Sequence, residues 1–241
     1  MTIENKTVLI TGANRGIGAA LVEQALKRGA KRVYAGTRRP LTHPDGRVTP
    51  LTLDVTDAAQ IRAASKSIQC LDILINNAGL SLYADLGDRR AIEQHLAVNL
   101  FGTYDTTQAF LPLLTSSRGA VVNVLSLAAL AAIPLEPTYS ISKAAAFSLT
   151  QSLRAALARH GVSVHAVLPG PVDTDMGPRI EIPKASPESV AEAILDAVEN
   201  GDEDIFPDPI SESVADGWRN GVAKALEGQF AALVGAEPAA P

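Results

Sequence analysis

The hydrophobic and polar positions of the chain form two alternating kinds of segment. Short runs that are apolar on both faces predict buried strands, and longer segments with apolar residues three and four positions apart predict helices. The predicted strands are 7–10, 32–35, 48–53, 72–75, 119–125, 162–168 and 204–206. The predicted helices are 17–28, 57–67, 88–114, 138–160, 187–199 and 211–233. This order predicts the α/β class, with a doubly wound parallel sheet and helices on both faces.

The pattern runs without a linker through most of the chain, so we expect a single domain. Residues 1–207 are predicted to form its doubly wound, Rossmann-type part, and 208–233 a helical extension of the same domain. The last residues, 234–241, are small and proline-rich, which favours a flexible tail.

Composition narrows the class of protein. Hydrophobic residues make up 46% and charged residues 20% of the 241 residues, which is typical of a folded globular chain. The net charge of -5 argues against nucleic acid as a partner, and the longest apolar run, 127–133, is too short to cross a membrane. The single cysteine, Cys70, excludes an intrachain disulfide and fits a reducing, cytoplasmic location. We interpret Cys70 as a small buried side chain.

A glycine-rich turn follows the first predicted strand. Small residues there let backbone N–H groups approach a phosphate, and the next helix presents its positive end to that phosphate. An architectural role for the glycines is the alternative. The predicted pyrophosphate-binding residues are Gly12, Asn14, Arg15, Gly16, Ile17 and Gly18.

The end of the second strand predicts which dinucleotide binds. Where enzymes that use NAD carry an acidic residue for the ribose 2′-hydroxyl, this chain has Thr37 followed by Arg38. Arg38 and Arg15 together predict recognition of a 2′-phosphate, and therefore NADP(H) as the cofactor. The alternative is that both arginines simply face solvent.

Four polar residues are candidates for proton-transfer chemistry. Tyr139 and Lys143 are four residues apart near a helix start, so both side chains can face one site. A neighbouring ammonium group favours the phenolate and is expected to lower the pKa of Tyr139. Ser126 ends the fifth strand, and Asn99 needs a polar partner among apolar neighbours. The pair taken alone also fits an amphipathic helix surface, and the Asn99 partner could be structural.

Together these motifs resemble those of the short-chain dehydrogenase/reductase family, in the branch with a Y-x-x-x-K active site. The resemblance rests on the T-G-x-x-x-G-x-G turn, N-N-A-G, the Asn–Ser–Tyr–Lys order and a Pro-Gly pair, and it covers about residues 6–207. It implies that Tyr139 is the acid and base, that Ser126 orients the carbonyl, and that Lys143 binds the nicotinamide ribose. Asn99 would support a proton-relaying water chain.

The resemblance also implies further cofactor contacts. Asp54 and Val55 match the residues beside the adenine, and Thr174 matches the residue that binds the carboxamide. The complete predicted cofactor site adds to the glycine turn Thr37, Arg38, Asp54, Val55, Asn77, Ala78, Gly79, Tyr139, Lys143, Pro169, Gly170, Val172 and Thr174. No residue spacing indicates a metal site.

The predicted activity is that of an NADP(H)-dependent carbonyl reductase or alcohol dehydrogenase. Leucine-rich segments at 80–83 and 127–135, with the loop at 175–185, predict a mainly apolar small-molecule substrate. A reductase of carrier-bound β-keto acyl groups, with Arg179 and Lys184 facing the carrier, and a non-catalytic NADP(H) sensor are the alternatives. Because the chain continues into a helix where tetrameric relatives end, we expect a homodimer. Phe206 and Trp218 either cap the pocket or pack that helix.

Overall fold

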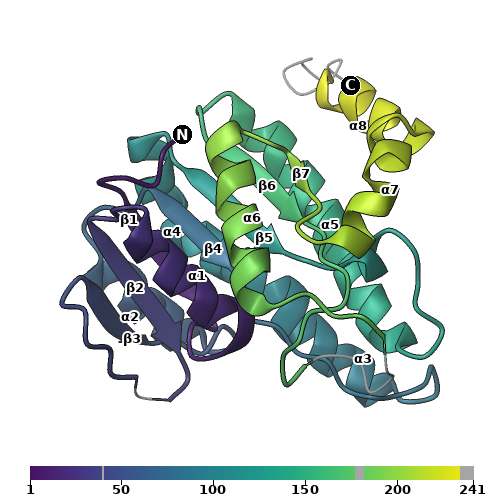
Figure 1. Ribbon diagram of the computed structural model, residues 1–241, viewed down its shortest axis with the longest axis horizontal. Coiled ribbons are helices and arrows are strands. Elements are labelled where there is room, and N and C mark those ends of the chain that lie inside the picture. Colours follow the sequence, from purple (N-terminus) through teal and green to yellow (C-terminus); the bar gives the residue numbers. More distant parts are fainter. Residues whose placement is uncertain (40, 177–181, 234–241) are drawn as a thin grey trace, which may run out of the picture.

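The sheet of the computed structural model has seven strands that are all parallel. The structure describes residues 1–39, 41–176 and 182–233. The strands lie in the order β3-β2-β1-β4-β5-β6-β7, and Figure 1 shows helices on both faces of the sheet. This arrangement confirms the predicted fold class. The strand bounds are β1 Thr7–Thr11, β2 Arg32–Thr37, β3 Val48–Thr52, β4 Ile73–Asn76, β5 Ala120–Val124, β6 Ser163–Val167 and β7 Asp204–Ile205.

Two groups of helices cover the sheet. Helices α1 and α6 lie on one face, in front of the sheet in Figure 1, while α2, α4 and α5 pack on the other. The bounds of the α-helices are α1 Gly16–Lys27, α2 Ala58–Ser67, α3 Arg89–His95, α4 Thr103–Ser117, α5 Pro137–Ala158, α6 Pro187–Asn200, α7 Pro209–Arg219 and α8 Val222–Ala231.

Each strand supplies both cores because successive side chains point to opposite faces. In β1, Val8 and Ile10 pack with α1 and α6, whereas Leu9 packs on the opposite side. Leu74 and Val121, on β4 and β5, join Leu9 there. All five are buried, as expected for the inner strands of a sheet covered on both faces.

The long helix predicted over 88–114 forms as α3 and α4, joined by a segment with a different hydrogen-bonding pattern. Between α3 and α4, the segment Leu96–Gly102 is a π-helix. Such π turns are rare and often occur at functional sites, and this one contains Asn99.

The single helix predicted over 211–233 is wrong, because the chain forms α7 and α8 with a break at Asn220 and Gly221. A Cβ added at Gly221 would lie 2.7 Å from the carbonyl oxygen of Gly217.

The prediction for Cys70 is also wrong, since its side chain is exposed. Ile68 and Leu71 occupy the buried positions of that segment instead.

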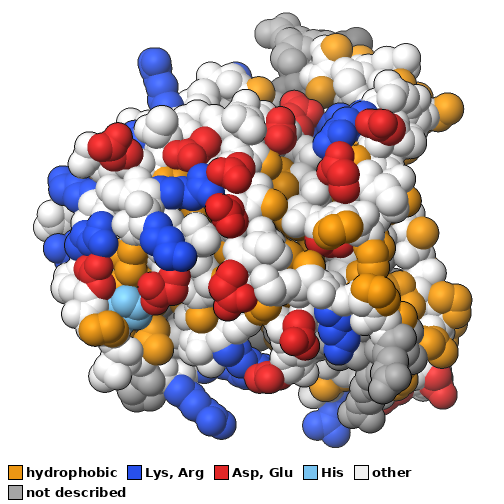
Figure 2. All heavy atoms as spheres, viewed as in Figure 1, with side chains coloured by type: hydrophobic (Ala, Val, Ile, Leu, Met, Phe, Trp, Pro, Cys, Tyr) orange, Lys and Arg blue, Asp and Glu red, His pale blue; other side chains and the backbone are white. Residues whose placement is uncertain are grey.

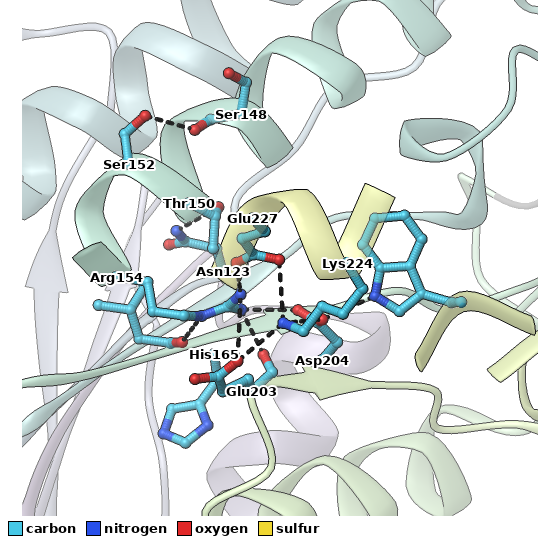
Figure 3. Close-up of polar contacts among 12 residues, drawn as sticks. Asn123, Ser148, Thr150, Ser152, Arg154, His165, Glu203, Asp204, Lys224 and Glu227 are labelled. Carbon is cyan, nitrogen blue, oxygen red and sulfur yellow. Dashed lines mark hydrogen bonds and ion pairs between the residues drawn. The ribbon is translucent and has the colours of Figure 1, made fainter. Parts of the chain in front are cut away.

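A cluster of charges holds α8 against β7 and α5. Figure 3 shows Arg154 of α5 and Lys224 of α8 converging on Asp204 of β7, with both N–O distances at 2.8 Å. Glu227 of α8 pairs with both cations. Burial raises the pKa of Asp204, but the nearby cations and hydrogen bonds outweigh this and hold it below its usual value. We call Arg154, Glu203, Asp204, Lys224 and Glu227 the C-terminal ion cluster.

Phe206 and Trp218 pack the last helices rather than stand free at a pocket. Phe206 is buried, and the Trp218 ring meets Phe147 of α5 edge-on at a centroid distance of 5.3 Å. The indole N–H donates to Asp204 at 2.8 Å.

The division of the chain at residue 207 stays a prediction, and 234–241 lies outside the described residues.

The surface carries charges of both signs. On the face covered by α1 and α6, Figure 2 shows acidic and basic side chains interspersed, without a broad basic area. In the part of the chain that the structure describes, no helix is long and apolar enough to cross a membrane.

Candidate active site

The predicted site residues gather at the carboxyl ends of the strands, beside the point where the strand order reverses. β1 pairs with β2 on one side and with β4 on the other, so the chain leaves its central strand in two directions. Open parallel sheets bind their ligands in the crevice outside such a switch point.

The glycine turn after β1 is shaped by contacts that leave no room for side chains. Gly12 and Gly16 have positive φ angles of 66° and 53°. A Cβ on Gly18 would lie 2.2 Å from the carbonyl oxygen of Gly12. The Asn77 amide donates to the carbonyls of Thr11 and Gly12, at 3.0 and 3.2 Å, and so ties the turn to the end of β4.

The start of α1 fits a phosphate group. Asn14 and Arg15 are exposed, and the Arg15 side chain makes no capping hydrogen bond to the helix. No acidic residue occupies the first turn, whose positive end faces the crevice with Ile17 half-buried behind it. A dinucleotide pyrophosphate is the group that such a turn accommodates.

The two arginines predicted at the 2′-phosphate differ in their surroundings. Arg38 is exposed after Thr37, whose hydroxyl donates to the Arg39 carbonyl at 2.5 Å. Arg15 pairs with Asp175 at 2.6 Å, with both side chains largely exposed. Asp175 is therefore the ion-pair partner of Arg15.

Asp54 and Val55 follow β3 at the same edge of the sheet. The Asp54 carboxylate accepts hydrogen bonds from the backbone N–H and the hydroxyl of Thr56. The backbone N–H of Asp54 donates to the Gln60 side chain. Val55 is buried against Gly102. A Cβ added to Gly102 would lie 2.7 Å from a methyl group of Val55. These contacts hold the segment rigidly beside the crevice.

The segment after β6 forms the facing wall. A Cβ on Gly16 would lie 2.9 Å from the Thr174 methyl group, so the segment reaches the glycine turn. Pro169 and Val172 are buried. The N–H of Gly170 donates to Asp208 at 2.7 Å, and that carboxylate also caps α7. The sequence interpretation missed Asp208, which a capping pattern after the last strand could have indicated.

Tyr139, Ser126 and Lys143 meet at the centre of the crevice. The Ser126 hydroxyl hydrogen-bonds to the Tyr139 phenol. The Lys143 ammonium lies 5.6 Å from the Tyr139 ring centroid and donates to the Val124 carbonyl at 2.9 Å. A Cβ added to Gly79 would lie 3.9 Å from the Lys143 Nζ, so the N-N-A-G turn lies beside the ammonium group.

The pKa values of this group differ from the expectation. Burial raises the pKa of Tyr139, the Ser126 hydrogen bond lowers it, and the Glu136 carboxylate raises it further. Burial alone lowers the pKa of Lys143 to about 8. The expected lowering at Tyr139 is therefore wrong for the protein by itself, since burial disfavours both charged forms.

Asn99 has the polar partners that the sequence required. Its carbonyl oxygen accepts the Leu80 N–H at 2.8 Å, and its amide donates to the Leu80 carbonyl at 2.9 Å. The same amide donates to the Ser142 hydroxyl at 2.9 Å. Asn99 therefore joins the π-helix, the segment after β4 and α5.

The structure adds two residues that the sequence interpretation did not select. His95 is buried, accepts the Leu82 N–H at 2.9 Å and meets the Tyr139 ring edge-on at 6.1 Å. Glu136 precedes α5 and accepts a hydrogen bond from Ser81. The i, i+4 spacing of His95 and Asn99 and the acidic residue three positions before Tyr139 were the available signals.

The predicted substrate-facing segments are tied to the elements around Tyr139. Leu80 binds Asn99, Leu82 binds His95, and Ile133 binds Ser140 of α5. Ile133 and Leu135 are exposed. Met176 is exposed, whereas Arg179 lies outside the described residues and Lys184 faces solvent. Among the residues described, no group of three or more His, Cys, Asp or Glu is placed to hold a metal ion.

This geometry defines a dinucleotide-binding α/β protein with a tyrosine, a serine and a lysine at its switch point. The family model described as short chain dehydrogenase matches residues 6–184. The chain belongs to the short-chain dehydrogenase family, whose members include oxidoreductases related to this protein.

Three relatives illustrate this membership. An uncharacterized oxidoreductase of Staphylococcus saprophyticus is 33% identical, over 82% of this chain and 92% of that protein. A short chain dehydrogenase of Burkholderia cenocepacia, solved in complex with NADP, is 38% identical, with a TM-score of 0.87 over 95% and 98% of the two chains. An NADPH-bound carbonyl reductase from chicken fatty liver is 28% identical, with a TM-score of 0.73 over 82% and 92%.

Proposed function

We propose that the protein is an NADP(H)-dependent carbonyl reductase that also catalyses the reverse oxidation of an alcohol. The observation that carries this proposal is the meeting of Tyr139, Ser126 and Lys143 at the crevice end of β5 and α5. A sensor that only bound the dinucleotide would gain nothing from burying a phenol and an ammonium side by side, because burial disfavours the charged form of each.

The residues around the crevice fit NADP(H). The glycine turn and the start of α1 would hold the pyrophosphate, and Arg38 would meet a 2′-phosphate after β2. Arg15 would join Arg38 once it exchanges Asp175 for the phosphate. Asp54, Val55 and the end of β4 would line the nucleoside. The NADP complex of the Burkholderia relative supports this choice.

Proton transfer is the task of the chain itself. When bound, the nicotinamide supplies the hydride. The Tyr139 phenol then donates its proton to the carbonyl oxygen during reduction, or accepts the alcohol proton during oxidation. Ser126 shares a hydrogen bond with that oxygen and keeps the phenol oriented. Lys143 places a positive charge near the phenolate, and Asn99 fixes the wall that connects Tyr139 to solvent.

The substrate is a small, mainly apolar aldehyde or ketone. The leucine-rich walls support this class, with Ile133 and Leu135 exposed 39% and 56% beside the tyrosine. A carrier-bound acyl substrate would require basic side chains at the mouth. The Glu136 carboxylate acts electrostatically on Tyr139, and a negative charge there would repel an acidic carrier.

The test is NADPH oxidation against a panel of aldehydes and ketones, with NADH in parallel and with the Tyr139→Phe variant. We expect turnover with NADPH, and a loss of about 10²–10⁴ in kcat for the variant with unchanged NADPH affinity. Binding of NADPH without turnover of any carbonyl compound would favour the sensor and refute the enzyme.

A further inference from the structure

Glu136 lies at the start of α5, the helix that carries Tyr139. It is the N-cap residue of α5, and Tyr139 is three positions later, which places the two side chains on adjacent parts of one helix start. Its carboxylate makes no capping hydrogen bond to the helix. Instead the side chain accepts a hydrogen bond from Ser81, in the segment after β4.

Both walls that hold this contact are rigidly anchored. On one side, Ser81 lies between Leu80, bound through both backbone groups to Asn99, and Leu82, bound through its N–H to His95. Asn99 and His95 are buried. Ser81 therefore has little freedom to move away from the carboxylate.

On the other side, the turn before α5 is tied to the first turn of the helix. The Ser140 hydroxyl accepts the Ile133 N–H and donates to the Glu136 carbonyl, both at 3.0 Å. The Glu136 N–H also donates to the Ile133 carbonyl at 3.0 Å. The backbone of Glu136 is thus fixed beside Tyr139.

The charge of Glu136 is felt inside the site. The carboxylate contributes to the raised pKa of Tyr139, and partial burial raises the pKa of Glu136 itself. Its partner among the described residues is the neutral Ser81 hydroxyl, so no described basic side chain offsets the charge. The apolar side chains of Ile133 and Leu135 beside it reduce screening by water.

We propose that Glu136 is a specificity-determining residue that makes the enzyme prefer carbonyl compounds carrying a cationic group over those carrying an anionic one. The inference rests on the proposed reductase activity and narrows its substrate class. A cationic group at the far end of an apolar substrate would lie near the carboxylate when the carbonyl oxygen meets Tyr139. An anionic group there would meet like charge.

The experiment compares three aldehydes that differ in the para substituent: 4-formyl-N,N,N-trimethylanilinium, benzaldehyde and 4-formylbenzoate. The measured quantity is the ratio of kcat/KM for the cation to that for the anion, with NADPH at one fixed pH. Because each aldehyde keeps its own reactivity, the change of this ratio between parent and Glu136→Gln isolates the effect of the charge. We expect the ratio to fall about tenfold, because the carboxylate attracts one substrate and repels the other.

Three controls make the result decisive. Glu4→Gln removes the same charge at the opposite edge of the sheet, where Glu4 is exposed, and should leave the ratio unchanged. Ser81→Ala keeps the charge but removes its hydrogen-bond partner, and should leave a smaller preference of the same sign. In the parent protein, raising NaCl from about 0.05 M to about 0.5 M should reduce the ratio, which tests the charge without any variant.

The outcomes separate the two proposals. If the parent reduces benzaldehyde but the ratio is equal in parent and Glu136→Gln, or is insensitive to salt, the inference is overturned and the reductase stands. If neither benzaldehyde nor either charged aldehyde is reduced, nor any member of the wider carbonyl panel, the proposed function fails and the inference with it.

Discussion

Asp204 is predicted to contribute more to stability than any exposed ion pair of the protein. Its side chain is 3% exposed and lies 2.8 Å from both Arg154 and Lys224. Removing one partner of a buried pair leaves an uncompensated charge, which costs about 3–5 kcal/mol. Because Glu227 also pairs with both cations, the Asp204→Asn variant should lie near the lower end of that range.

The assay is equilibrium unfolding in urea, followed by far-UV circular dichroism and by fluorescence of Trp218, the single tryptophan. A loss of about 3 kcal/mol corresponds to a fall in Tm of roughly 6–12 °C for a chain of this size. Trp218 donates to Asp204, so its fluorescence reports on the C-terminal ion cluster, whereas circular dichroism reports on the whole fold. A fluorescence transition at lower urea would show that α7 and α8 detach first.

The matched control is Glu212→Gln, which removes one member of an exposed pair. Glu212 and Arg219 are 3.5 Å apart, with side chains 57% and 46% exposed. Such pairs contribute about 0–1 kcal/mol. If Asp204→Asn costs no more than this control, the argument that burial makes the ion cluster strong is refuted.

Three further predictions concern the cofactor site and acid stability. Arg38→Ala should weaken NADPH binding about tenfold or more in a fluorescence titration while leaving NADH binding unchanged. Asp175→Asn should strengthen NADPH binding by releasing Arg15. Equal effects of either variant on both cofactors would contradict a 2′-phosphate contact. Gly18→Ala should lose about 1–3 kcal/mol of stability and most NADPH affinity, since its Cβ would meet a carbonyl oxygen at 2.2 Å; normal unfolding and binding would disprove that close approach. Burial lowers the pKa of His95; a backbone hydrogen bond opposes this shift, and the Lys143 charge adds to it. The contribution of neutral His95 to stability is therefore complete above the pKa of the unfolded state, about 6.5, and is lost as the pH falls below it. Urea unfolding at several pH values should therefore show a flatter acid dependence in His95→Gln, and an unchanged slope would count against this assignment.

The sheet and the position of the glycine turn could be predicted because their signals are local. Strands that are apolar on both faces and a glycine turn after the first of them suffice to indicate the switch point. The π turn around Asn99 could not be predicted, since it shifts backbone hydrogen bonds without altering the apolar periodicity. Cys70 was misplaced for a related reason: periodicity in a short connection does not decide which of two neighbours faces inward.

The residues that were missed depend on contacts between distant segments. His95 gains its place beside Tyr139 because the segment after β4 folds back onto α3. Glu136 becomes a feature of the crevice through Ser81, 55 positions earlier in the chain by the difference of the residue numbers. Neither contact leaves a periodic pattern. Buried polar groups that bond across elements therefore have to be read from the structure.

The C-terminal extension and the predicted cofactor site share one carboxylate. Asp208 accepts the Gly170 N–H at 2.7 Å and caps α7 through Ile210 and Ser211. A Cβ on Gly170 would lie 2.8 Å from the same carboxylate, so the two segments are in direct contact. The C-terminal ion cluster binds α8 to α5 and β7, and its Asp204 also accepts the Trp218 indole N–H of α7. Its strength therefore also affects how firmly the turn at Gly170 is positioned. Loosening the last helices should therefore affect cofactor binding before it affects Tyr139, whose anchors lie on β5 and α5.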